Sequence, residues 1–107
     1  MRIIFDQGTP VPLRSHLKHH SIDTVYECGW SNLENGELLD SIEQQGYELL
    51  ITTDQNLRFQ QNLSKRTFAV LVLLTTSWPK IAPHVAAIGA AVDQMTPGEY
   101  REFPLPS

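Results

Sequence analysis

The sequence predicts an α/β fold in which a mostly parallel sheet of about four to five strands carries helices on both faces. Short aliphatic runs alternate along the chain with segments whose apolar residues recur at helical spacing. The run at 67–74, TFAVLVLL, contains no charged residue and is typical of a central parallel strand covered on both faces. Because the 107 residues contain no repeat and no linker, we expect one domain, 1–107, with right-handed crossovers.

The first half of the chain is predicted to supply two strands and two helices. Residues 2–6 form an apolar strand that ends in an aspartate, and a turn leads into a helix with Thr9 as N-cap and prolines in its first turn. A second strand, rich in β-branched residues, covers 22–26. Asn35 is the expected N-cap of the next helix, and Gly46 is suited to end it in the left-handed conformation.

The second half is predicted to supply three strands. Residues 48–53 form the third strand, one or two helical turns follow at 56–63, and 67–74 is the fourth strand. Ser77 is the expected N-cap of a long helix with proline in its first turn and apolar residues at helical spacing. A short edge strand at 99–103 completes the sheet.

Three acidic residues fall at one edge of this predicted sheet. Asp6 ends the first strand, Glu37 lies in the first turn of the helix after the second strand, and Asp54 follows the third strand. The carboxyl ends of parallel strands face the crevice in which open α/β sheets bind ligands. Two carboxylates about 5 Å apart repel by roughly 3 kcal/mol at an effective dielectric near 20, so such a cluster needs a proton or a divalent cation. The structural alternative is that these acids form turns and cap a helix.

A cation held by Asp and Glu oxygens alone is expected to be Mg²⁺ or Mn²⁺ rather than Zn²⁺. Such a cation activates a bound water for attack on phosphorus, so the predicted reaction is metal-assisted hydrolysis of a phosphodiester. The formal net charge of −4 argues against binding of nucleic acid by bulk electrostatics alone. Acidic residues concentrate in 21–57, which contains no Lys or Arg. A solvated acidic surface is the alternative reading of that segment.

Four segments resemble the small PIN-like domain family, which is often described as the toxin component of bacterial toxin–antitoxin systems. The segments are RIIFDQGTP at 2–10, NGELL at 35–39, TTDQNLRFQQNL at 52–63 and SWPKIAPH at 77–84. The resemblance covers essentially the whole chain, and its most specific parts are D-x-N-L-x-x-Q-Q-N-L and N-G-E-L-L. It implies a three-layer, Rossmann-like PIN fold and a Mg²⁺- or Mn²⁺-dependent ribonuclease, with RNA as substrate and an antitoxin protein as partner.

Matched to the family pattern, Asp6, Glu37 and Asp54 would be the catalytic acids and the metal ligands. Many PIN nucleases carry a further acid where this chain has Asn56, which can ligate through its carbonyl but lowers the negative charge of the site. Basic and polar residues around the same edge are expected to contact the substrate, namely Arg14, Arg58, Gln61, Thr75 and Ser77.

Two other functions fit parts of this pattern. One is a PIN-like module that binds RNA or a protein partner without cutting, which Asn56 favours. The other is a receiver-type phosphoacceptor domain, but Asp6 is followed by Gln7 and no lysine follows Lys80. The single Cys28 is typical of a reducing compartment, and the sequence contains no apolar run of about 18 residues, so we expect a cytoplasmic protein that does not bind membranes. A homodimer would help so small an acidic chain to build an RNA groove.

Overall fold

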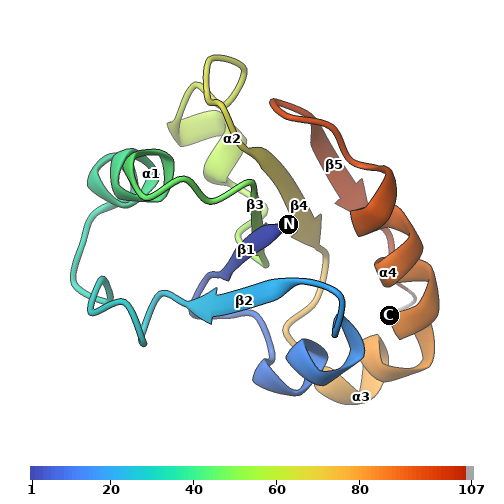
Figure 1. Ribbon diagram of the computed structural model, residues 1–107. Helices are drawn as coiled ribbons and strands as arrows, with labels where there is room; N and C mark the ends of the chain where they lie inside the picture. Colours follow the sequence, from blue (N-terminus) through green and yellow to red (C-terminus); the bar gives the residue numbers. More distant parts are fainter. Residues whose placement is uncertain (106–107) are drawn as a thin grey trace.

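A single parallel sheet forms the centre of the computed structural model, which describes residues 1–105 (Figure 1). Its strand order is β2-β1-β3-β4-β5, and every neighbouring pair is parallel. The predicted α/β fold with a parallel sheet is therefore confirmed. The strands are β1 (Arg2–Phe5), β2 (Ser21–Thr24), β3 (Leu49–Thr52), β4 (Ala69–Leu73) and β5 (Tyr100–Phe103).

Helical segments cover both faces of the sheet and complete three layers (Figure 1). One face carries α1 (Asn35–Gln44) and α2 (Leu57–Gln60). The other face carries η1 (Val11–His16), α3 (Trp78–Ile81), η2 (Ala82–His84) and α4 (Val85–Gln94). Within residues 1–105, no helix has the length and apolar character needed to cross a membrane.

Each inner strand supplies side chains to two separate cores, because successive residues of a strand point to opposite faces. In β3, Leu49 and Ile51 pack with Ile88 of α4, whereas Leu50 packs with Leu39 of α1. All residues of β3 and β4 are buried, as the uninterrupted apolar runs predict. Burying each such side chain stabilises the fold by roughly 1.5–3 kcal/mol.

The crossover from β4 to β5 has the opposite hand to the other three. The β2–β3 and β3–β4 connections run toward the β5 edge of the sheet and cover the face that carries α1. The β1–β2 connection runs toward the opposite edge and covers the other face, so these three crossovers have the same hand. The β4–β5 connection also runs toward the β5 edge, but it covers the face opposite α1. The prediction of one hand throughout is therefore wrong for the last crossover. Its helix α4 buries the part of β3 and β4 that the short η1 leaves uncovered.

Three predicted helices differ in detail. The first is a short 3₁₀ helix that ends at His16. The N-cap of α1 is Glu34, not Asn35, which is already helical. The long helix predicted after Ser77 is divided into α3, η2 and α4 around Pro83. Proline lacks the N–H needed for a helical hydrogen bond and clashes with the preceding turn, so the regular helix starts again only after it.

Candidate functional site

The direction of chain winding reverses between β1 and β3. The chain passes from β1 outward to β2 and then returns across β1 to β3. Such a reversal leaves a crevice outside the carboxyl ends of the strands, where open α/β sheets bind their ligands. Asp6 follows β1 directly, and Asp54 follows β3 with one residue between them, so the structure places both predicted acids at this carboxyl edge.

The hydroxyl of Thr52 links these two aspartates. It donates a hydrogen bond to Asp6 Oδ2 at 2.8 Å and accepts one from the backbone N–H of Asp54 at 3.1 Å. The Thr52 side chain is 0% exposed, so water does not compete for either bond. Asp6 and Asp54 are therefore both held through one buried oxygen atom.

Both aspartates also stabilise the turns that follow their strands. Asp6 Oδ1 accepts a hydrogen bond from the N–H of Gln7 at 2.9 Å, and Asp54 Oδ1 accepts one from the N–H of Asn56 at 2.9 Å. The side chain of Asn56 makes no capping bond to α2. Because each carboxylate oxygen can accept two hydrogen bonds, the turns leave lone pairs on both aspartates that can meet a cation.

Glu37 is directed toward the start of its own helix. Its Oε1 accepts a hydrogen bond from the N–H of Glu34 at 3.4 Å, while the Glu34 carboxylate accepts one from the N–H of Glu37. This reciprocal capping box satisfies two backbone N–H groups at the helix start. Among the residues that the structure describes, no three His, Cys, Asp or Glu side chains are grouped closely enough to hold a metal ion. The structure thus joins the Asp6 carboxylate and the Asp54 backbone through Thr52, and gives Glu37 a structural contact instead.

Arg58 lies toward the β5 end of the carboxyl edge. Its Nη1 is 3.7 Å from Glu102 Oε2, and its guanidinium carbon lies 4.6 Å from the centre of the Phe59 ring and 5.9 Å from that of Tyr100. The Tyr100 hydroxyl donates to Glu102 Oε2 at 2.9 Å. Arg58 is only partly buried, so its guanidinium can still turn toward an anionic ligand.

The remaining predicted contacts lie on two loops of this edge. A Cβ atom at Gly36 would lie 3.8 Å from both polar atoms of the Gln61 amide, so Gln61 sits at the start of α1. Thr75 and Ser77 form the turn after β4, where the Ser77 N–H donates to Thr75 Oγ1 at 3.1 Å. A Cβ at Gly8 would lie 3.7 Å from the Thr76 side chain, which brings this turn beside the turn after β1.

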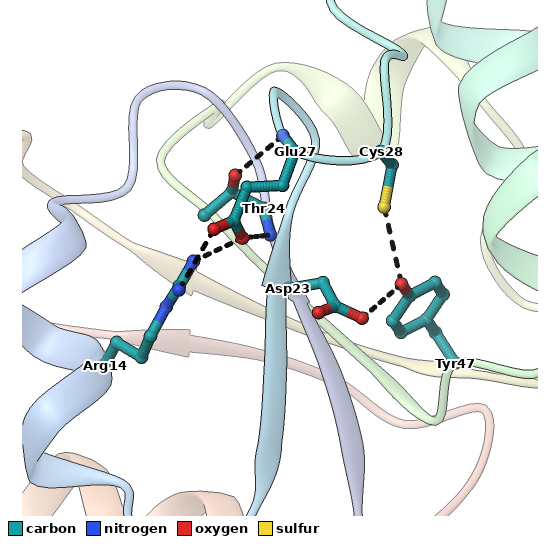
Figure 2. Close-up of polar contacts among 6 residues, drawn as sticks. All are labelled: Arg14, Asp23, Thr24, Glu27, Cys28 and Tyr47. Carbon is teal, nitrogen blue, oxygen red and sulfur yellow. Dashed lines mark hydrogen bonds and ion pairs between the residues drawn. The ribbon is translucent and has the colours of Figure 1, made fainter.

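A cavity of about 470 Å³, the β1–β2 pocket, opens beside Asp6 at the ends of β1 and β2. Arg14 of η1 contributes one wall and forms two hydrogen bonds to Glu27, Nη1 to Oε2 at 3.2 Å and Nη2 to Oε1 at 2.6 Å (Figure 2). The pocket is lined by Asp6, Gln7, Thr9, Val11, Arg14, Thr24, Tyr26 and Glu27. The predicted substrate contact Arg14 is therefore already paired with an acid.

The pairing of Arg14 and Glu27 is reinforced by the end of β2. Glu27 Oε1 accepts the N–H of Thr24 at 3.0 Å, and Thr24 Oγ1 accepts the N–H of Glu27 at 3.0 Å. The hydrogen bond to Glu27 raises the pKa of Arg14, and the same bond lowers the pKa of Glu27. Both groups therefore stay charged at neutral pH. The buried Arg14 Nε has no hydrogen-bond partner within residues 1–105.

A second polar network lies on the other side of β2 (Figure 2). The Tyr47 hydroxyl donates to Asp23 Oδ2 at 2.6 Å and lies 3.4 Å from Cys28 Sγ. Burial and the hydrogen bond to Asp23 raise the pKa of Tyr47, so its phenol keeps its proton. The guanidinium of Arg2 lies 4.5 Å from the centre of the same ring. This network fastens the loop after β2, which carries one wall of the β1–β2 pocket.

Sequence reasoning missed three residues of the carboxyl edge. Thr52 is the single polar residue of β3, and a hydroxyl at the end of a buried strand beside an aspartate is a signal that can be read from the sequence. Tyr26 and Glu102 give no comparable signal, because their positions depend on the path of the loop after β2 and on the pairing of β5 with β4.

Tyr100 reports on the charges at the β5 end of the edge. Burial, the hydrogen bond to Glu102 and the charges of Glu102 and Asp54 raise its pKa from 10.0 to about 12, and Arg58 opposes them. The folded chain holds this proton more tightly than the unfolded chain, so the contribution to stability is complete below pH 10.0 and is lost as the pH rises to about 12. We expect the wild type to lose more unfolding free energy over this range than Tyr100→Phe, as measured by urea unfolding. Equal losses would contradict this linkage.

Comparisons with protein-family models, with curated proteins and with solved structures found no match to this chain. A functional proposal for it therefore depends on its own residues and their arrangement.

Proposed function

We propose that this chain is a PIN-like endoribonuclease that depends on Mg²⁺ or Mn²⁺ and acts as the toxin of a toxin–antitoxin pair in the cytoplasm. The observation that carries the proposal is that the Asp6 carboxylate and the Asp54 backbone N–H share the buried Thr52 hydroxyl, where the strand order reverses. The segments that resemble PIN-like domains include both aspartates. Water would be the nucleophile, and an RNA phosphodiester would be the bond that is hydrolysed.

The donor atoms at this edge fit a hard divalent cation. Asp6 and Asp54 offer carboxylate oxygens with lone pairs that the turns leave free, and Asn56 offers an amide oxygen close by in the chain. Mg²⁺ retains several waters and is commonly held by one or two carboxylates together with substrate phosphates. Two aspartates therefore match the number of carboxylates that commonly hold Mg²⁺. When bound, the cation would acidify a water molecule and offset charge on the phosphate.

The chain itself positions the reacting groups. Thr52 fixes the rotamer of Asp6 by donating to its Oδ2, and the Asp54 turn is anchored on the same hydroxyl. Arg58 is available to an RNA phosphate at the β5 end of the edge. Glu37 contributes negative charge at the start of α1 without leaving its capping bond.

The direct test is cleavage of a panel of single-stranded and hairpin RNAs by the purified chain, with Mn²⁺ and with EDTA. We expect cutting in Mn²⁺ and none in EDTA. Products should carry the termini of hydrolysis by water, with no 2′,3′-cyclic phosphate. Cutting that persists in EDTA would overturn the metal-dependent mechanism.

Mn²⁺ is also expected to stabilise the folded chain. A ligand that binds only the native state adds about 2.7 kcal/mol at 100 times its Kd, so the melting temperature should rise with metal concentration. The measurement is thermal unfolding followed by circular dichroism at increasing Mn²⁺. The double variant Asp6→Asn with Asp54→Asn should not respond. A wild-type melting temperature that ignores millimolar Mn²⁺ would count against a site at these residues.

A second candidate is a PIN-like module that binds RNA or a protein partner without cutting. Two observations favour it: the Glu37 carboxylate caps α1 instead of facing the aspartates, and neutral Asn56 stands in the position of an acid. The acidic edge would then receive a basic segment of the partner. A chain that cuts no RNA in Mn²⁺ but binds the product of a neighbouring small reading frame would support this function over the first.

A further inference from the structure

The β1–β2 pocket lies beside the proposed metal-binding residues, and the proposed hydrolysis gives it no role. Its volume of about 470 Å³ falls in the range of cavities that hold small organic ligands. Asp6 belongs both to the pocket wall and to the link with Thr52. A group seated in the pocket would therefore lie next to any phosphate that approaches Asp6.

The charges of the pocket do not suit a phosphate. Arg14 is the one cationic side chain among the lining residues, and two hydrogen bonds to Glu27 already neutralise it. Asp6 leaves the wall with a net negative charge. A neutral group that carries N–H donors complements such a wall, and a second anion does not.

The two large apolar side chains that line the pocket are mostly exposed to solvent. Within residues 1–105, the large hydrophobic side chains that remain exposed are Tyr26 at 79%, Phe59 at 73% and Val11 at 57%. All three follow the carboxyl ends of strands, and Val11 and Tyr26 line the pocket. The turn after β2 fixes the backbone at Tyr26, because its carbonyl accepts the N–H of Gly29 at 3.0 Å. An exposed aromatic ring beside a pocket can stack on a flat ligand.

We infer that the β1–β2 pocket receives one unpaired nucleobase of the RNA, stacked on Tyr26, with its neighbouring phosphate at Asp6. A nucleobase has the flat apolar faces that Tyr26 and Val11 can cover and the N–H groups that an acidic wall can bind. The inference rests on the proposed function and adds to it a binding site for one base, which must be unpaired because a paired base cannot enter a pocket. It also predicts a base preference at one position next to the cut bond.

The test is a titration of the ¹⁵N-labelled chain in EDTA with each of the four nucleosides and with ribose, followed by amide chemical shifts. We expect the nucleosides to shift amides of Gln7, Thr9 and Glu27, and ribose to leave them unchanged. Tyr26→Ala should weaken nucleoside binding by at least about 5-fold, the smallest effect expected when one stacked base loses its aromatic partner.

Phe59→Ala is the matched control, because Phe59 is a similarly exposed aromatic at the same edge that does not line the pocket. It should leave nucleoside binding to the pocket unchanged. Equal weakening by Tyr26→Ala and Phe59→Ala, equal shifts from ribose, or no shifts of the pocket amides at millimolar nucleoside would each overturn the inference. Because no metal and no cleavage are involved, pocket binding in a chain that cuts no RNA would reject the ribonuclease and retain the pocket.

Discussion

Asp6→Asn is expected to lower Mn²⁺-dependent RNA cleavage by about 100-fold or more, because loss of even an outer-shell partner of a metal ligand costs about 10- to 100-fold. The substitution removes one of two carboxylates and keeps the shape of the side chain. The Asn carbonyl can still accept the Thr52 hydroxyl, and the bond that is lost is the exposed one from the Gln7 N–H, so the fold should persist. Initial rates over a range of Mn²⁺ concentrations measure the effect, which should appear partly as weaker apparent metal affinity.

Two further variants show whether this loss is specific. Glu37→Gln removes a charge but keeps the capping box, since Gln serves at this position as well as Glu. It should reduce cleavage far less than Asp6→Asn does. Asp93→Asn makes the same chemical change at an exposed residue near the end of α4 and should leave cleavage unchanged. If Glu37→Gln reduced cleavage as much as Asp6→Asn does, Glu37 would count as a third acid of the site.

The strands could be predicted because the side chains of each inner strand pack into two cores, one on each face of the sheet, and this requires an uninterrupted apolar run. The apolar runs that contain β3 and β4 suit strands that are covered on both faces, and their ends fall within two residues of the predicted positions. Gly46 adopts φ of 75°, as its place after α1 predicts. The break at Pro83 is also visible in the sequence, but the helical spacing of the apolar residues on both sides favours a continuous helix. Which face of the sheet α4 covers depends on the area of β3 and β4 that the short η1 leaves uncovered. No local sequence pattern encodes that area.

The candidate site was predictable where a side chain follows directly from a strand end. Asp6 and Asp54 are carried to the carboxyl edge by the strands before them, so their placement needs no tertiary information. The direction of Glu37 depends on which backbone N–H groups at the helix start lack partners, and Glu34 supplies the competing contact. Arg14 and Glu27 come from different elements, and their pairing follows from how η1 packs beside the end of β2.

Thr52→Val is expected to lower both the stability and the activity of the chain. The change keeps the shape of the side chain but leaves Asp6 Oδ2 without its donor and the Asp54 N–H without its acceptor, at a fully buried position. A buried polar group that loses its partner costs about 1–3 kcal/mol, so urea unfolding should show a loss of that size. Cleavage in saturating Mn²⁺ should also fall, because Asp6 is then free to leave the rotamer that Thr52 holds.

Thr52→Ser separates the hydroxyl from the packing of the methyl group. Serine keeps the donor and acceptor and loses one buried methyl, which costs roughly 1 kcal/mol. If the hydroxyl positions Asp6, Thr52→Ser should retain most of the cleavage activity while Thr52→Val does not, even where the two unfold at similar urea concentrations. Full cleavage by Thr52→Val would show that Asp6 is positioned without Thr52, and equal losses in both variants would assign the effect to packing alone.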